Sequence, residues 1–182
     1  MKLIYGFIGS PGSGKSTQAE LFAKYIKTDL LNVGQALRAS KNKEIIKVIE
    51  SGSLAPDEFV EDIIEKELRS LGKNGGVVLD GFFRRKSEVE WLVESERALD
   101  FDIAVVFDIT ISKKEAVKRL SSRGRADDDP KDIIKRLKIF KKQYKEVSKT
   151  LRKSAVKLVK VNGEQTVDEV FLELKDLYKQ YV

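Results

Sequence analysis

The chain of 182 residues contains no cysteine, no histidine and only three prolines. Without cysteine it has no disulfide, no thiolate nucleophile and no cysteine-ligated zinc site. Without histidine it lacks the commonest general base and the commonest metal ligand of proteins. Any chemistry must therefore depend on lysine, arginine, carboxylates, hydroxyls and backbone groups.

Long apolar runs are also missing. The segment from Met1 to Gly9 is apolar, but it is too short to span a membrane and has no signal-peptide cleavage pattern. No later segment approaches the length of a spanning helix. We therefore expect a soluble, cytoplasmic protein with no membrane partner.

The charge balance is basic, with 35 lysines and arginines against 29 acidic residues. Such an excess suits a nucleic acid, and it equally suits a polyanionic small substrate. The charges are mostly interleaved along predicted helices, as between Lys131 and Lys149, which is typical of a solvated helix face. Nucleic acid is therefore not the expected partner, and nothing in the sequence indicates an oligomeric state.

Apolar runs and helical patterns alternate along the chain. Strands are predicted at 2–8, 29–32, 77–80, 103–107 and 156–161, and helices at 15–26, 56–70, 87–99, 112–122, 130–153 and 166–181. Three of the strand candidates are near-continuous Val/Ile/Leu/Phe runs, the pattern of strands buried on both faces of a parallel sheet. The fold predicted is α/β, a single-domain three-layer α/β/α sandwich around a five-stranded parallel sheet.

Three local features refine this prediction. Ser87 opens a Ser-Glu-Val-Glu sequence that predicts a capping box at the start of its helix. Residues 34–70 contain two or three helices, more than one crossover requires. Residues 119–129 form a charged, hairpin-sized segment between two helices, so both regions are candidates for lobes that cover a ligand.

A glycine-rich loop joins the first strand to the first helix. Gly9 to Thr17 reads G-S-P-G-S-G-K-S-T, which fits the P-loop pattern G-x-x-x-x-G-K-[ST] in its expected context. Such glycines let backbone N–H groups surround phosphate oxygens at the positive end of the helix. The pattern predicts a P-loop nucleotide-binding fold in which Lys15 reaches the β- and γ-phosphates of ATP and Ser16 ligates Mg²⁺. The predicted ATP-binding residues of this loop are Gly12, Ser13, Gly14, Lys15, Ser16 and Thr17.

Two acidic residues at strand ends are candidates for the second metal ligand. Asp80 ends the third predicted strand and Asp108 the fourth, and both positions lie beside the phosphate loop in a parallel sheet. Asp80 is preferred because Arg84 follows it closely and supplies a cation to the same crevice.

Arginines after strand ends and around the charged segment are the other candidates. Phosphoryl transfer through a loose transition state needs positioning and positive charge more than it needs a base. The candidate phosphate clamps are Arg38, Arg84, Arg119, Arg123, Arg125 and Arg136.

Five ordered segments, together with Pro11 and Gln18 of the phosphate loop, carry a resemblance to a known family. They read Gly-Gln-Ala-Leu-Arg at 34–38, Gly-Ser-Leu-Ala-Pro-Asp at 52–57, Asp-Gly-Phe-Phe-Arg at 80–84, Arg-Ala-Asp-Asp at 125–128 with Arg-Leu at 136–137, and Asn-Gly-Glu at 162–164. In this order they resemble the adenylate kinase-like nucleoside monophosphate kinases over almost the full length of the chain.

The resemblance implies reversible transfer of the γ-phosphate of Mg-ATP to a nucleoside monophosphate, AMP first among them. It implies that Arg38 and Arg84 hold the acceptor phosphate and that Arg119 lies against the donor base. A further implication is an acceptor-binding lobe at 34–70 and a short lid at 123–129. The catalytic set implied is Lys15, Arg84, Arg123, Arg125 and Arg136, and the acceptor-binding set is Gly34, Arg38, Ala55, Arg84 and Glu88.

The chain departs from the family pattern mainly in the acceptor half. Gln35 replaces an acid, Phe83 replaces the proline of Asp-Gly-Phe-Pro-Arg, and Arg85 adds a cation. Glu88 stands where adenylate kinases carry a glutamine that reads adenine, and Val33 stands where they commonly carry threonine. A carboxylate only accepts hydrogen bonds, which suits the amino groups of guanine or cytosine better than adenine. The base therefore stays open among AMP, CMP, UMP and GMP.

Two other functions follow from the same departures. Glu88, Phe83 and Arg85 are compatible with a P-loop kinase that acts on a non-nucleotide acceptor. Gln35 and the net positive charge are compatible with an ATP-binding regulatory or nucleic-acid-associated protein with little kinase activity.

Overall fold

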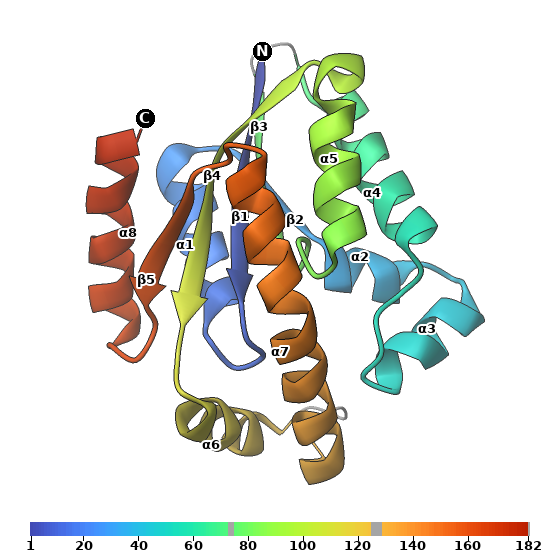
Figure 1. The fold of residues 1–182 in the computed structure, drawn as a ribbon, viewed down its shortest axis with the longest axis vertical. Coiled ribbons are helices and arrows are strands. Elements are labelled where there is room, and N and C mark those ends of the chain that lie inside the picture. The colour runs from blue at the N-terminus through green and yellow to red at the C-terminus, as the bar shows by residue number, and fades with distance from the viewer. Residues whose placement is uncertain (73–74, 125–128, 182) are drawn as a thin grey trace.

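A parallel sheet forms the centre of the molecule (Figure 1). The computed structural model describes residues 1–72, 75–124 and 129–181. Within them the sheet has five strands in the order β2-β3-β1-β4-β5, all parallel. Their bounds are Lys2–Gly9 (β1), Asp29–Asn32 (β2), Gly76–Asp80 (β3), Phe101–Thr110 (β4) and Leu158–Asn162 (β5). The predicted α/β fold with a five-stranded parallel sheet is confirmed.

Helices cover both faces of the sheet. They span Lys15–Ile26 (α1), Val33–Ala39 (α2), Lys43–Glu50 (α3), Asp57–Ser70 (α4), Lys86–Leu99 (α5), Lys113–Arg123 (α6), Pro130–Lys153 (α7) and Val167–Tyr181 (α8). Helices α1 and α8 pack on one face through Phe22 and Leu174, and α5 and α7 pack on the other through Leu92 and Val147. Figure 1 shows α5 and α7 in front of the strands.

The central strands are buried on both faces, which explains their continuous apolar sequences. In β1, Ile4 belongs to the core beneath α5 and α7, and Phe7 belongs to the core beneath α1 and α8. Phe7, Phe22 and Phe107 form a compact aromatic cluster with ring centroids 5.3 to 5.6 Å apart. This burial makes the sheet a rigid platform for the loops that follow its strands.

Several element boundaries differ from those predicted. Strand β4 extends beyond 103–107 at both ends, and β5 begins at Leu158, two residues later than predicted. The capping box predicted from Ser87 is wrong: α5 begins at Lys86, and its N-cap is Arg85. Glu88 accepts the Arg85 backbone N–H instead, because the first amides of a helix need acceptors and Glu88 stands at the third helical position.

The strand order brings the functional loops to one edge of the sheet. Strand β1 lies between β3 and β4, and Phe7 pairs with Asp80 while Ile8 pairs with Asp108. Both aspartates thus flank the exit of β1 into the phosphate loop. Helices α2, α3 and α4 lie together beyond the β2 edge, at the right of Figure 1.

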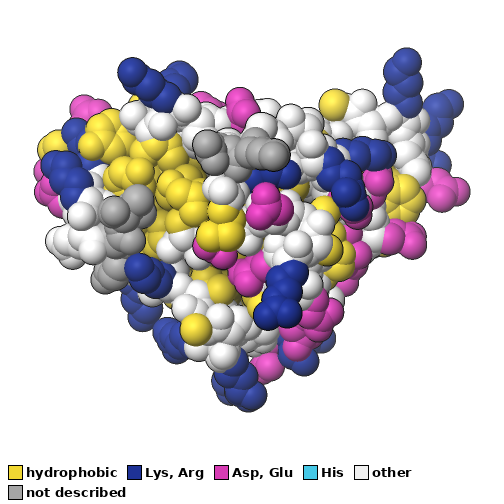
Figure 2. Space-filling model, turned by 90° about the horizontal axis from the view of Figure 1, so that it is seen from above, with side chains coloured by type: hydrophobic (Ala, Val, Ile, Leu, Met, Phe, Trp, Pro, Cys, Tyr) yellow, Lys and Arg dark blue, Asp and Glu magenta, His cyan; other side chains and the backbone are white. Residues whose placement is uncertain are grey.

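The opposite end of the molecule carries a mixed surface. Figure 2 shows basic and acidic side chains scattered over this face, with hydrophobic side chains gathered on one side. This distribution fits a solvated surface. Among the residues that the structure describes, no helix combines the length and the apolar character needed to cross a membrane.

Candidate active site

The phosphate loop has the backbone that its glycines predict. Gly12 and Gly14 have φ angles of +81° and +86°, a left-handed conformation that favours glycine. A Cβ atom on Gly12 would lie 3.0 Å from the Ala116 carbonyl oxygen and from Leu120 Cγ. Helix α6 therefore packs directly against the loop and holds it in place.

Polar groups of this loop lack protein partners. The buried hydroxyl oxygens of Ser10 and Ser13 make no hydrogen bond within the described part of the chain. Buried polar groups are almost always paired, so unpaired hydroxyls in a loop at a helix N-terminus fit the oxygens of a phosphate chain. The ATP-binding residues predicted for the loop remain a prediction, and Thr17 lies at its exposed end.

Four cations converge at the phosphate loop. Burial lowers the pKa of Lys15 to about 8; Asp80 opposes this shift, and Arg84, Arg136 and Arg123 add to it. These arginines come from three separate segments of the chain, yet each lies near enough to influence Lys15. Such a convergence of cations fits a polyanionic ligand.

Asp80 lies at the bottom of this site. Its side chain is only 2% exposed, and Oδ2 accepts a hydrogen bond of 2.6 Å from Asn32 Nδ2. The other carboxylate oxygen, Oδ1, is buried without a hydrogen-bond partner among the described residues. That free oxygen and the partly buried Ser16 fit Mg²⁺, which needs few protein ligands because phosphates and waters complete its shell.

Asp108 has a different environment. Its carboxylate accepts a hydrogen bond from the Tyr144 hydroxyl of α7, and burial raises its pKa. The carboxylate thus joins β4 to α7. Asp80, with an unpaired oxygen beside Lys15, is the better candidate metal ligand.

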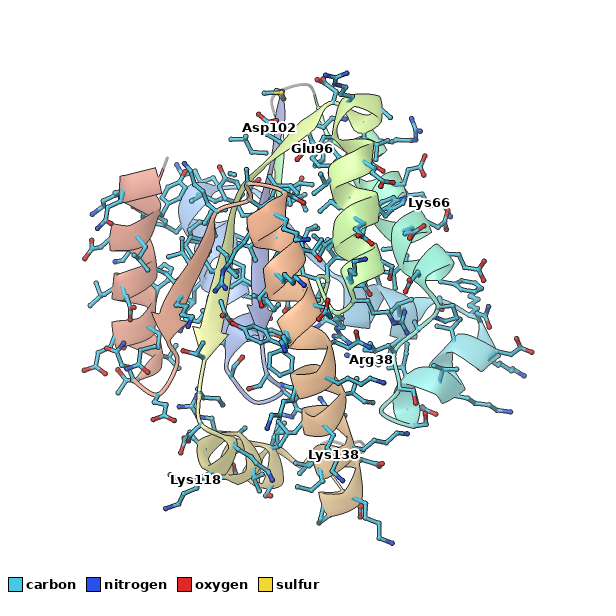
Figure 3. All side chains as sticks on the ribbon, in the orientation of Figure 1. Arg38, Lys66, Glu96, Asp102, Lys118 and Lys138 are labelled. Carbon is cyan, nitrogen blue, oxygen red and sulfur yellow. The ribbon has the colours of Figure 1, made fainter. Side chains whose placement is uncertain are left out.

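The predicted acceptor side contains a second group of cations, Arg38 and Arg84 beside Gly34. A Cβ atom on Gly34 would lie 3.5 Å from a guanidinium nitrogen of Arg38 and 3.8 Å from one of Arg84. Figure 3 labels Arg38 in the space between α2 and α7 in that view. Two guanidinium groups beside the same residue fit the recognition of one phosphate group.

Hydrogen bonds join the loop after β3 to the segment 54–57. The Arg85 guanidinium donates to the carbonyl oxygens of Ala55 (2.6 Å) and Leu54 (3.2 Å) and to the Asp57 carboxylate. Glu88 is 2% exposed, and its Oε2 accepts from the backbone N–H groups of Arg84 (2.6 Å) and Arg85 (3.3 Å). Burial raises the pKa of Glu88 in spite of these bonds. Two of the predicted acceptor-binding residues, Ala55 and Glu88, therefore contact the protein itself.

Arg119 lies at the donor end of the site. It donates to Glu115 on its own helix (2.7 Å) and to the carbonyl oxygen of Gly163 (2.9 Å) in the loop after β5. A Cβ atom on Gly163 would lie 3.1 Å from the Ser13 carbonyl oxygen, so this loop touches the phosphate loop. The geometry thus places Arg119 beside the start of the predicted ATP site.

Helix α7 reaches the segment 34–70 from the other side. A Cβ atom on Gly52 would lie 3.2 Å from Arg136 Cγ, and Lys135 donates to the Ser51 carbonyl oxygen. Arg123 is the last residue of α6. The predicted residue Arg125, with the rest of 125–128 in the predicted lid, lies outside the described residues.

Comparison with known proteins agrees with this arrangement. The sequence model of the adenylate kinase family matches residues 7–156. The chain belongs to the adenylate kinase family. It is 32% identical over 175 residues to adenylate kinase 1 of Nostoc sp., covering 93% of this chain and 95% of that protein. Identity to the adenylate kinase of Azobacteroides pseudotrichonymphae is 34% over 179 residues (93% of each chain), and to that of Nautilia profundicola 30% over 190 residues (99% and 98%).

Family membership confirms the enzyme class predicted from the motifs. The chain is an ATP-dependent nucleoside monophosphate kinase of the adenylate kinase type. The two groups of cations, one at the phosphate loop and one beside Gly34, are consistent with this enzyme class.

Two residues of this kinase's site were missed in the sequence. Asn32 donates to Asp80 and also accepts the Gln35 backbone N–H at 2.9 Å, as the N-cap of α2. An asparagine directly before a helix is a recognisable cap signal, but its second bond depends on the pairing of β2 with β3. Arg85 was noted only as an extra cation, and nothing local indicates its carbonyl partners 30 residues away.

Proposed function

We propose that this kinase catalyses the reversible transfer of the γ-phosphate of Mg-ATP to AMP. The carrying observation is the convergence of Lys15, Arg84, Arg123 and Arg136, together with the guanidinium groups of Arg38 and Arg84 beside Gly34. AMP is the acceptor indicated by the names of the relatives. A cytoplasmic location is part of the proposal.

For the donor, the amides of Gly12 to Thr17 surround the β- and γ-phosphates. Lys15 lies where it contacts the transferring group, and the unpaired Ser10 and Ser13 hydroxyls are available to donate to phosphate oxygens. Arg119, held by Gly163, supports the donor base. Ser16 and Asp80 would hold Mg²⁺, which supplies charge neutralisation to the phosphate oxygens.

For the acceptor, Arg38 and Arg84 bind the phosphate of the monophosphate beside Gly34. An oxygen of that phosphate attacks the γ-phosphorus while the bond to the β-phosphate oxygen breaks, which yields two diphosphates. The attacking oxygen carries negative charge already, so the absence of histidine does not hinder the reaction. Arg84, Arg123 and Arg136, with Arg125, neutralise the charge on the transferring group.

Two segments would close over the nucleotides. The segment 34–70 carries Arg38 and forms the acceptor lobe, and 123–129 forms the lid. Closure excludes water, which would otherwise accept the phosphoryl group.

Turnover with a panel of monophosphates tests this proposal. ADP formation is measured with ATP, Mg²⁺ and AMP, CMP, UMP or GMP, and we expect the highest kcat/KM with AMP. Rates no higher than ATP hydrolysis for every monophosphate would refute nucleotide transfer. A preference for CMP, UMP or GMP would refute only the assignment of AMP as the acceptor.

A further inference from the structure

The loop between β3 and α5 has a backbone that the family proline cannot adopt. Phe83, which stands in place of that proline, has a φ angle of +57°. The proline ring restricts φ to about −65°. This chain must therefore orient the next residue, Arg84, by other means.

The Phe83 side chain holds the loop against the core. It is 1% exposed and packs on Phe82 with ring centroids 4.8 Å apart. A Cβ atom on Gly6 would lie only 2.4 Å from the Phe83 ring, so strand β1 has a glycine where the ring needs space. The burial of the ring offsets the strain of its left-handed backbone.

Glu88 holds the loop from the side of α5. A single oxygen, Oε2, accepts the N–H groups of both Arg84 and Arg85, at 2.6 and 3.3 Å. A carboxylate is a strong acceptor for backbone amides, and here burial shields the bonds from water. The orientation of the Arg84 main chain therefore depends on a side chain one turn into the next helix.

Arg85 connects the same loop to the lobe that carries Arg38. Its guanidinium contacts Leu54, Ala55 and Asp57, and Ser87 adds a hydrogen bond to Asp57. Hydrogen bonds from Arg85 thus join the loop that carries Arg84 to the segment 54–57.

We infer that Glu88 is a positioning residue, which aims Arg84 at the acceptor phosphate through the loop backbone and does not read the acceptor base. The inference rests on the proposed function. It follows that base recognition depends on other side chains, and that Glu88 affects every acceptor equally.

Two variants of Glu88 separate the two roles. E88Q keeps one side-chain oxygen for the two backbone donors and replaces the other oxygen with an amide donor. A positioning role predicts near wild-type kcat/KM and the same ranking of AMP, CMP, UMP and GMP. E88A removes the acceptor, and we expect kcat/KM to fall roughly tenfold or more by the same factor for each substrate used, with the KM for ATP unchanged.

A double-mutant cycle with Arg84 shows whether Glu88 acts through that arginine. In the R84A background, E88A should cause no further loss of kcat/KM, because the group being aimed is gone. E90A is the matched control on α5, since Glu90 pairs only with Lys86 among the described residues. Thermal unfolding of each variant measures stability separately. If E88A does not fold, E88Q and its ranking of acceptors still decide between the roles.

Two results would overturn the inference: a changed ranking of acceptors in E88Q, or an undiminished E88A loss in the R84A background. Failure of the proposed function is distinct, because the wild type would then transfer phosphate to no monophosphate. In that case the same cycle is measured with inorganic phosphate binding by calorimetry. Additive losses of affinity there would also count against positioning.

Discussion

The donor and acceptor halves of the site are built in different ways. The donor half comes from consecutive residues, Gly9 to Thr17, with two left-handed glycines and a helix N-terminus. The acceptor half joins distant segments: Arg85 donates to the Ala55 carbonyl oxygen, Glu88 accepts the Arg84 backbone N–H, and the Arg84 guanidinium lies beside Gly34. A site made of consecutive residues depends little on its surroundings. A site assembled from distant segments depends on each contact between them. The departures from the family pattern nevertheless lie mainly in the acceptor half.

Removal of Lys15 should have the largest effect and should break the donor half alone. K15A is expected to lower kcat by roughly 100- to 1000-fold, because it removes a cation at the transferring phosphoryl group. Since burial lowers the pKa of Lys15 to about 8, its charge disfavours folding below that pH, and the cost disappears as pH rises toward the ordinary value. K15A should therefore unfold at the same temperature as the wild type or higher. K24A, an exposed lysine on the same helix, is the control and should keep full activity.

Proline at position 83 should break the acceptor half through its backbone. F83P forces φ to a value far from +57° and removes a buried ring, so we expect a loss of at least about 3 kcal/mol in the free energy of unfolding. Urea denaturation measures it. F83L keeps an apolar side chain and should lose less. If F83P were as stable as the wild type, the loop would be able to adopt a second backbone conformation at no cost in stability.

Arg85 tests whether the acceptor lobe depends on its link to the loop. R85A removes hydrogen bonds to Leu54, Ala55 and Asp57 and should raise the KM for the monophosphate about tenfold. The KM for ATP should stay within about twofold, and steady-state kinetics with each substrate varied measures both. The control is R97A, at an exposed position in the last turn of α5, and it should change neither KM value. An equal rise in both KM values would mean that the two halves are not independent.

Substitution of Asn32 should have the smallest effect. This residue contacts both Asp80 of the donor half and α2 of the acceptor half, so it tests where the two halves meet. N32A removes the cap of α2 and the donor to Asp80, and we expect a loss of about 1 kcal/mol in unfolding free energy. N32D keeps the cap but places a second carboxylate beside Asp80. Because two carboxylates this close repel each other, its stability without Mg²⁺ should fall below that of N32A, and its Mg²⁺ concentration for half-maximal activity should differ from the wild type. Identical Mg²⁺ titrations for all three proteins would argue against Asp80 as a metal ligand.

The sequence predicted the features whose signals are local. The phosphate loop, α1 and the buried strands are each encoded in neighbouring residues, through glycine conformations and continuous apolar runs. Glu88 shows the limit of such reasoning. Its spacing from Arg84 and its chemistry pointed to an acceptor base, and its position in the fold puts one oxygen on the backbone of Arg84 and Arg85.

By itself, then, the sequence determined the α/β class, the donor loop and the family, because each depends on short-range pattern or ordered motifs. Only the tertiary structure decided which aspartate keeps a buried oxygen without a hydrogen-bond partner among the described residues, and which groups the Arg85 and Glu88 side chains contact. Tyr144 binds Asp108 and Asn32 leaves one oxygen of Asp80 free, and both pairings join segments far apart in the chain. The physical reason is that a hydrogen bond is decided by the distance between two groups, and for distant segments only the packed core sets that distance.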